Sequence, residues 1–239
     1  MTTPVNNGYS VSINHEGVKQ SPGRTRGRPA LPLDRILTAA LDIVDEHGAD
    51  ALSMRSLAQR LGSGTATLYR HFAGRTELVA MVVDRMLGEV HLDASGLSWQ
   101  HACTSLAQQM FDALGRHGNV ASLLIGQVPT GPNALAQREF VLSVLLRNGF
   151  APVIAAHAYA TLSRYVLGFA IQVSTAAATA QDDAAVSAAF RQLDPSQYPA
   201  TVAVADELPV PLAEEFNFGL SLIVAGLAAR NDEPHASGR

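Results

Sequence analysis

Apolar side chains recur every three or four positions over residues 34–47, a spacing that predicts a first helix with one buried face. The same spacing returns over residues 53–61, 64–73 and 75–91, and glycines separate these stretches. Two short helices joined by a glycine-containing turn predict a helix-turn-helix, although other helical hairpins share the pattern. We therefore expect three short helices followed by a longer connecting helix.

The second helix of this pair has a polar outer face. Leu57 and Leu68 are placed to join the two helices, whereas Thr67 and Arg70 fall on the outside. Residues 53–75 hold four arginines and no acidic residue, although the net charge of the whole chain is −4. A basic face on an otherwise acidic protein predicts a polyanionic partner at one end, with a merely solvated charged surface as the alternative.

The composition is that of a globular protein. The 239 residues are 47% apolar and 16% charged, which excludes wholesale disorder. The single cysteine, Cys103, fits a reducing cytoplasm. The apolar stretch over residues 150–180 carries His157 and Arg164, so we expect a cytoplasmic protein without a membrane partner. No spaced metal cluster, nucleophile motif or phosphate-binding loop occurs, which argues against an enzyme and against a metal or other cofactor.

Residues 1–31 are rich in Gly, Pro and Ser without periodicity, which predicts a flexible basic arm. The arm contains Arg26-Gly27-Arg28-Pro29. Arg-Gly-Arg-Pro is the core of AT-hooks, in which two arginines enter an A·T-rich minor groove. Arg26 and Arg28 are therefore candidate DNA contacts, unless the arm is only a soluble tail.

Several short strings stand out between residues 36 and 86. They are LSMRSLA at 52–58, LG at 61–62, TLYRHF at 67–72 and RTEL at 75–78. In these strings the chain resembles the TetR family of bacterial transcriptional regulators. The resemblance implies an all-α fold in which a small helix-turn-helix head of three helices, residues 32–78, precedes a larger ligand-binding and dimerisation domain, residues 79–231, and a C-terminal tail, residues 232–239.

Shorter motifs continue along the body: SW at 98–99, PT at 129–130, NGF at 148–150 and an apolar run at 216–227. They resemble the tetracycline-repressor type of C-terminal domain, which implies a homodimer formed by a four-helix bundle. The bundle helices would be residues 152–180 and 213–230, whose apolar stripes are broader than one buried face needs. Burial of both helices within a monomer is the alternative. Between them, residues 181–211 predict a mobile connection with one short helix near 184–192.

The resemblance implies two sets of DNA contacts in the head. Base edges would be contacted by Arg55, Thr65, Ala66, Thr67 and Arg70. Phosphates would be contacted by Ser53, Tyr69, His71 and Arg75. The chemistry agrees, because arginine binds guanine O6 and N7 together and threonine offers thymine a hydroxyl and a methyl group. For Tyr69, the alternative to a phosphate contact is that its side chain packs within the head.

The resemblance also places an effector cavity in the body. Its predicted lining is His91, Leu106, Met110, Leu124, Gln127, Val128 and Phe140. Tetracycline repressors bind a drug–magnesium chelate through a His and a Thr, and Leu124 and Gln127 stand at those positions. Leucine cannot ligate magnesium, so a more apolar effector without a metal is expected. The alternative is that these side chains are ordinary core.

These features predict a one-component sensor. A homodimeric repressor would bind a palindromic operator in double-stranded DNA and leave it when a small-molecule effector binds. An activator with the same fold is one alternative. Another is a nonspecific or architectural DNA-binding protein that uses its basic arm, which a steep salt dependence without sequence preference would reveal.

Overall fold

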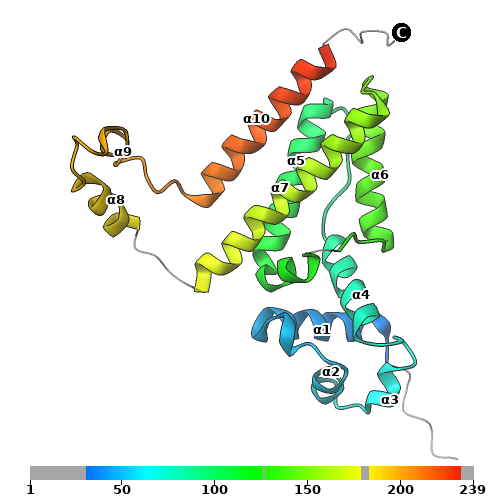
Figure 1. Cartoon of the computed structure of the whole chain (residues 1–239). Helices are drawn as coiled ribbons and strands as arrows, with labels where there is room; N and C mark the ends of the chain where they lie inside the picture. The colour runs from blue at the N-terminus through cyan, green and yellow to red at the C-terminus, as the bar shows by residue number, and fades with distance from the viewer. Residues whose placement is uncertain (1–30, 126, 179–182, 233–239) are drawn as a thin grey trace, which may run out of the picture. The chain divides into compact units, whose positions relative to one another are not determined.

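The computed structural model of the chain describes residues 31–125, 127–178 and 183–232, and within these ranges the protein is all-helical, as predicted (Figure 1). The α-helices are α1 (Leu33–His47), α2 (Met54–Arg60), α3 (Thr65–Leu68), α4 (Arg75–Leu87), α5 (Trp99–Arg116), α6 (Pro132–Arg147), α7 (Pro152–Ala178), α8 (Asp183–Arg191), α9 (Pro199–Ala203) and α10 (Leu212–Asp232). Two 3-10 helices are η1 (Ala49–Ala51) and η2 (Gly118–Leu124). The predictions for the arm, with Arg26 and Arg28, lie outside the described residues.

Helices α1, α2 and α3 form the head. Every one of them contributes to a core whose largest shielded side chains are Ile36, Val44, Leu52, Leu57, Leu68 and Phe72. Leu57 and Leu68 are both completely buried and join α2 to α3, as the spacing predicts. Gly62 sits between these helices with a φ of 57°, a left-handed conformation that glycine adopts without steric cost.

Helices α3 and α4 are shorter than predicted. Helix α3 ends at Leu68, and the chain continues in tight turns in which the His71 amide donates to the Leu68 carbonyl at 2.8 Å. Hydrogen bonds between residues three positions apart, as in a 3-10 helix, tighten the last turn of a helix. Helix α4 ends at Leu87 rather than near residue 91, because the bonds that follow span three residues instead of four: the Glu89 amide donates to the Met86 carbonyl at 3.0 Å and the Val90 amide to the Leu87 carbonyl at 3.4 Å.

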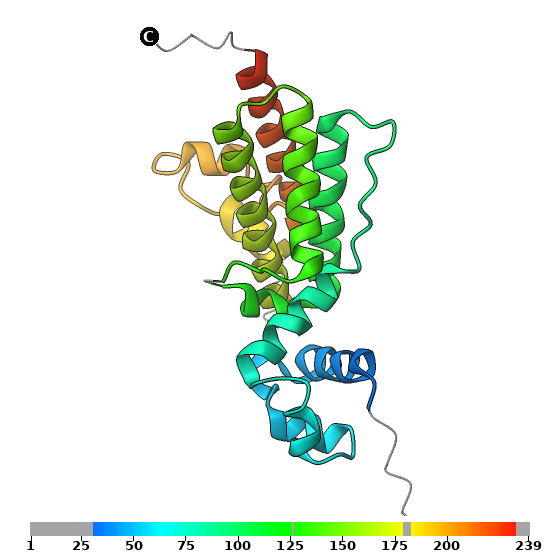
Figure 2. The same ribbon diagram turned by 90° about the vertical axis from the view of Figure 1, so that its right-hand side faces the viewer.

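The body is built from α5, α6, α7 and α10, which lie side by side (Figure 2). Helix α7 packs against the other three and against η2. The Tyr165 hydroxyl on α7 donates to the carbonyl of Phe216 on α10 at 2.8 Å. The ring of Phe216 stacks on Phe111 of α5 with centroids 4.1 Å apart. Gly219 permits this approach, since a Cβ atom there would lie 2.2 Å from the Tyr165 oxygen.

Helices α8 and α9 form a separate pair in the connection between α7 and α10 (Figure 1). The Ser187 hydroxyl donates to the Ala205 carbonyl at 2.7 Å, and Arg191 forms an ion pair with Asp206. Neither helix contains a buried residue. Helix α8 matches the short helix predicted near 184–192, whereas the sequence pattern did not predict α9.

Candidate DNA interface and effector cavity

The start of α2 is held by two serines. The Ser53 hydroxyl accepts from the Ser56 amide, and the Ser56 hydroxyl accepts from the Ser53 amide, both at 3.0 Å. This capping box pairs two of the amides that a helix start leaves without partners. The Ser56 hydroxyl also donates to the carbonyl of Ala51 at 2.7 Å. Ser53, a predicted phosphate contact, therefore also fixes the orientation of α2.

The outer face of the helix-turn-helix presents most of the predicted base contacts to solvent. The exposed residues there are Arg55, Thr65, Ala66, Tyr69 and Arg70. Thr67 and His71 are half-buried. Within residues 31–125, the Arg55 and Arg70 side chains make no hydrogen bond or ion pair. Two unpaired guanidinium groups beside threonine hydroxyls form a surface that can donate hydrogen bonds to nucleic acid.

Two other arginines of the head are already bound within it. Arg75 donates from Nε to the Leu52 carbonyl at 2.8 Å and from Nη2 to the Ala49 carbonyl at 2.9 Å. Arg60 donates from Nη1 to Glu46 Oε2 at 2.7 Å, which lowers the pKa of that carboxyl group below its ordinary value. Arg75, a predicted phosphate contact, thus links the start of α4 to the chain just before α2, a role that its spacing did not reveal.

An apolar cavity of about 330 Å³ lies in the body. Side chains from α4, α5, α6 and α7 line it, together with the chain that follows η2. The structure brings together five of the seven predicted lining residues: Leu106, Met110, Leu124, Gln127 and Val128. Its size and apolar walls are typical of a small-molecule site.

His91 and Phe140 do not line this cavity. Because α4 ends early, His91 lies in an exposed loop, where its amide donates to Gln109 Oε1 at 3.0 Å. On α6 the cavity is lined by Gln137 and Val141, and the helical rotation turns Phe140 onto the adjacent face, where it is half-buried against the core. Neither residue lies among the lining of this cavity, and their role in ligand binding stays a prediction.

Five lining residues with a polar or thiol side chain were missed. They are Cys103, Gln137, Tyr159, Ser163 and Arg164. Gln137 carried a usable signal, because a glutamine within the apolar stripe of a helix indicates a buried hydrogen bond. Burial raises the pKa of the Cys103 thiol to about 11, so it remains protonated at neutral pH.

Helices α4 and α6 cap each other beside the cavity. The Asp84 carboxylate of α4 accepts from the Asn133 amide at 3.3 Å and the Ala134 amide at 3.0 Å, at the start of α6. In return, Gln137 of α6 donates from Nε2 to the Leu87 carbonyl at the end of α4 at 2.7 Å. Asp84 and Gln137 are the two buried polar residues of the described core. Helix α4, which follows the head, is therefore hydrogen-bonded to α6, and α6 lines the cavity.

A second polar link joins the head to the body through His117. Its Nδ1 lies 2.7 Å from Asp45 Oδ2 of α1, and its Nε2 lies 3.1 Å from Glu89 Oε1. Although burial alone would raise the pKa of Glu89, hydrogen bonds from Arg116 and His117 hold it below its ordinary value. The His117 imidazole thus forms hydrogen bonds with Asp45 of α1 and with Glu89, just after the end of α4.

No group of three His, Cys, Asp or Glu residues that could hold a metal occurs in the part of the chain that the structure describes. A head with a cationic helix-turn-helix, joined to a helical body that contains an apolar cavity, is the architecture of a ligand-responsive transcriptional regulator.

The comparisons with known proteins agree with this class. Residues 36–82 match the family described as bacterial regulatory proteins, tetR family, and residues 92–231 match the tetracyclin repressor-like C-terminal domain. The chain belongs to the TetR family of transcriptional regulators.

Relatives and solved structures match most of the chain. An HTH-type transcriptional regulator of Saccharopolyspora erythraea is 32% identical over 214 residues, which are 86% of this chain and 88% of the relative. Tetracycline repressor protein class E of Escherichia coli is 29% identical over 208 residues, 85% of this chain and 93% of the repressor. The crystal structure of apo ActR from Streptomyces coelicolor matches with a TM-score of 0.78 and 32% identity, covering 86% of this chain and 99% of ActR. The chain is thus a DNA-binding transcriptional repressor with a ligand-binding domain, not an enzyme.

Proposed function

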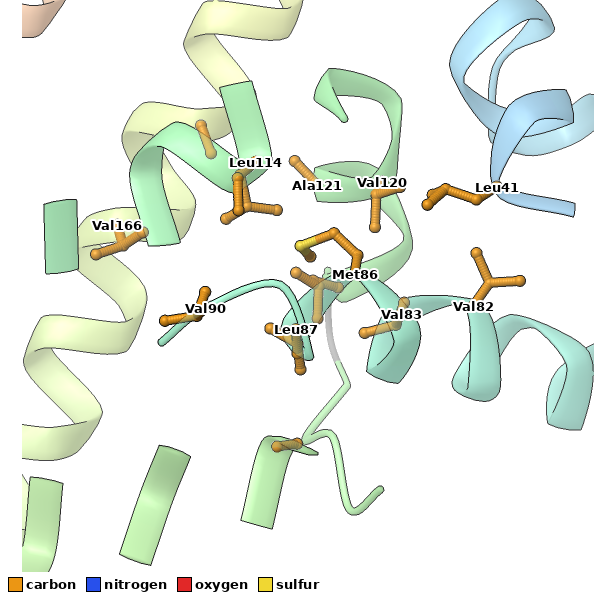
Figure 3. Close-up of a cluster of buried hydrophobic side chains, with 14 of the residues drawn as sticks. Leu41, Val82, Val83, Met86, Leu87, Val90, Leu114, Val120, Ala121 and Val166 are labelled. Atoms are coloured by element: carbon orange, nitrogen blue, oxygen red, sulfur yellow. The ribbon is translucent and has the colours of Figure 1, made fainter. Parts of the chain in front are cut away.

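We propose that the chain is a homodimeric repressor that a small, largely apolar organic effector releases from a palindromic operator. One observation carries this proposal: a single apolar cluster extends from the head to the cavity (Figure 3). Leu41 of α1 and Val82 of α4 lie at its head end. Leu87 lies near its middle and Val166 at its other end, with Leu114 between them, and these three also line the cavity.

Occupancy of the cavity would reach the DNA-binding face through α4. A bound molecule touches Leu87 on α4 and Gln137 on α6, and the Gln137 amide holds the Leu87 carbonyl. At its other end α4 starts at Arg75, whose guanidinium holds the Leu52 and Ala49 carbonyls of the head. A shift of α4 therefore moves the helix-turn-helix. The effector must favour the shifted state over the DNA-bound state, because equal affinity for both would change nothing.

An exposed apolar face of α10 supports the dimer. Phe218 is 66% exposed and Leu222 is 57% exposed. With Ala225 and Ala229, which are also exposed, they form one apolar stripe at intervals of four, three and four residues. Helix α10 is long and apolar enough to cross a membrane, and only 17% of its most apolar window is buried. We assign the stripe to a second copy of the chain, since a palindromic site needs two heads spaced by about 34–36 Å.

The outer face of the head is assigned to DNA. Base edges are assigned to Arg55, Thr65, Ala66, Thr67 and Arg70. Phosphates are assigned to Ser53, Tyr69, His71 and Arg75. Arg26 and Arg28 of the arm are assigned to the adjacent minor groove. The exposure of Arg55 and Arg70, whose side chains have no hydrogen bond or ion pair with another described residue, supports the first assignment.

The cavity favours an effector that carries no metal. Its lining among the described residues contains no Asp or Glu, whose carboxylates are the side-chain ligands that a hard cation such as magnesium prefers, and no His. ActR from Streptomyces coelicolor has been crystallised in complex with actinorhodin. For the present cavity, the apolar walls suit an organic molecule.

The proposal is tested by selecting DNA from a random duplex pool with the purified full chain and sequencing the bound fraction. We expect a palindromic consensus whose half-sites are separated by about one helical turn, as two recognition helices require. If no sequence is enriched at moderate salt, the chain is not a sequence-specific repressor, and a nonspecific DNA-binding protein is the better reading.

A further inference from the structure

The charge on the cavity lining is opposite to that of the surrounding body. Residues 91–239 contain twelve acidic and seven basic residues. Among the described lining residues there is no carboxylate, whereas Arg164 of α7 contributes a guanidinium. Arg164 is exposed, so this cation lies at the solvent side of the cavity and the apolar walls lie within.

A second cation, Arg138, lies next to residues that line the cavity. Arg138 of α6 is half-buried, and its guanidinium carbon lies 5.5 Å from the centre of the Tyr159 ring, which lines the cavity. It donates from Nη2 to the carbonyl of Pro129, another lining residue, at 3.0 Å. Both contacts leave its positive charge uncompensated.

Two arginines of the body are paired with acids, whereas Arg147 of α6 and Arg230 of α10 form no ion pair among the described residues. Arg116 lies 3.1 Å from Glu89, and Arg191 pairs with Asp206. Arg138 and Arg164 have no carboxylate within 4.0 Å in the described part of the chain. The positive charge beside the cavity is therefore not neutralised by the protein.

Arg164 is the one charged residue among the described lining residues, beside the neutral polar side chains of Gln127, Gln137, Tyr159 and Ser163. The Ser163 hydroxyl is occupied because it donates to the Tyr159 carbonyl at 2.8 Å, and the Gln137 amide holds the Leu87 carbonyl. Guanidinium groups bind carboxylates and sulfonates through charge-assisted hydrogen bonds, which are about twice as strong as neutral ones.

We propose that the effector is an organic acid, with an apolar body inside the cavity and one ionised acid group on Arg164 at its mouth. This inference rests on the proposed function, since it requires the cavity to be the effector site. It identifies Arg164 as the residue that selects an anion over a neutral molecule of the same shape.

The test uses two fluorescent probes that share one apolar skeleton. Anilinonaphthalene sulfonate carries an acid group, and N-phenylnaphthylamine lacks it. Their affinities are measured on the full chain, on Arg164→Gln and on Met110→Trp, which fills the cavity. We expect Arg164→Gln to weaken the sulfonate probe by about tenfold, the loss of one hydrogen bond to a charged group, and to change the neutral probe by less than about twofold.

Matched controls separate the two proposals. Arg147→Gln removes an exposed arginine of α6 that does not line the cavity and should leave both probes unchanged. If Met110→Trp blocks both probes but Arg164→Gln affects them equally, the cavity remains the binding site and the organic-acid inference is overturned. If neither probe binds, or Met110→Trp changes nothing, the cavity assignment itself fails. If Arg164→Gln dissociates the dimer, Arg164 is an interface residue and the inference is likewise overturned.

Discussion

Removal of the Asp84 carboxylate should weaken the attachment of α4 to α6. The N-cap residue of α6 is Gly131, which has no side chain that could cap the helix. The Asp84 carboxylate of α4 caps it instead, by accepting hydrogen bonds from the Asn133 and Ala134 amides. Loss of a cap costs about 1 kcal/mol. Asp84 is only 8% exposed, so the abandoned amides are also poorly solvated, which adds about 1–3 kcal/mol. We expect Asp84→Ala to lower the free energy of unfolding by about 2–4 kcal/mol.

Urea unfolding followed by tryptophan fluorescence measures this change. Trp99 is the single tryptophan, and its ring lies edge-on to Phe150 with centroids 4.8 Å apart, so its emission reports the body. Wild type and variants are compared at one protein concentration, because dimerisation couples stability to concentration. Asp112→Ala, which removes an exposed acid of α5, is the matched control and should change stability by less than about 0.5 kcal/mol.

Gly131→Ala tests whether Asp84 stabilises the chain through the cap of α6 or only through its negative charge. A Cβ atom at Gly131 would lie 2.3 Å from the Asp84 carboxylate, so Gly131→Ala should displace it. Gly131→Ala should therefore cost less in the Asp84→Ala background than in wild type, since the two changes remove the same interaction. A loss for Asp84→Ala no larger than that for Asp112→Ala, or strictly additive costs, would refute the reciprocal capping.

Three further outcomes follow from the same contacts. Arg70→Ala should weaken binding to a selected operator by about 1–3 kcal/mol, measured by fluorescence anisotropy. Arg60→Ala should have a much smaller effect, because the Arg60 guanidinium is already bound to Glu46. Equal losses of affinity for the two variants would contradict the assignment of this face to DNA. Gly219→Ala should destabilise the chain in urea by about 1–3 kcal/mol because its Cβ would collide with the Tyr165 hydroxyl; unchanged stability would mean that the contact is not close. With a pKa of about 11, Cys103 should react slowly with a thiol reagent at pH 8, and faster as the pH approaches 11 or when urea unfolds the chain; rapid labelling of the native protein would argue against its burial.

The head could be predicted closely from the sequence, because its structure depends on local signals. Ser53 caps α2, Gly62 forms the turn, and Leu57 and Leu68 are buried at the expected spacing. The lengths of α3 and α4 were overestimated, since a helical pattern of apolar residues cannot show where the backbone hydrogen bonds shorten from four residues to three at the end of a helix.

The cavity was predicted only in part, because its walls come from helices distant in the sequence. Leu106 and Met110 lie four residues apart on α5 and face the cavity together, as periodicity suggests. Gln137 and Arg164 enter from α6 and α7, and their positions depend on how those helices pack. The pairing of Asp84 with Ala134 joins residues fifty positions apart, which no local pattern can reveal.

The most direct test of a sequence-specific dimeric repressor is a titration of the full chain with the selected operator and with a scrambled duplex of equal length, at one salt concentration. We expect two chains per operator and an affinity for the operator at least about a thousandfold higher than for the scrambled duplex. Equal affinities for the two duplexes would contradict the assignment of the head to sequence-specific DNA binding.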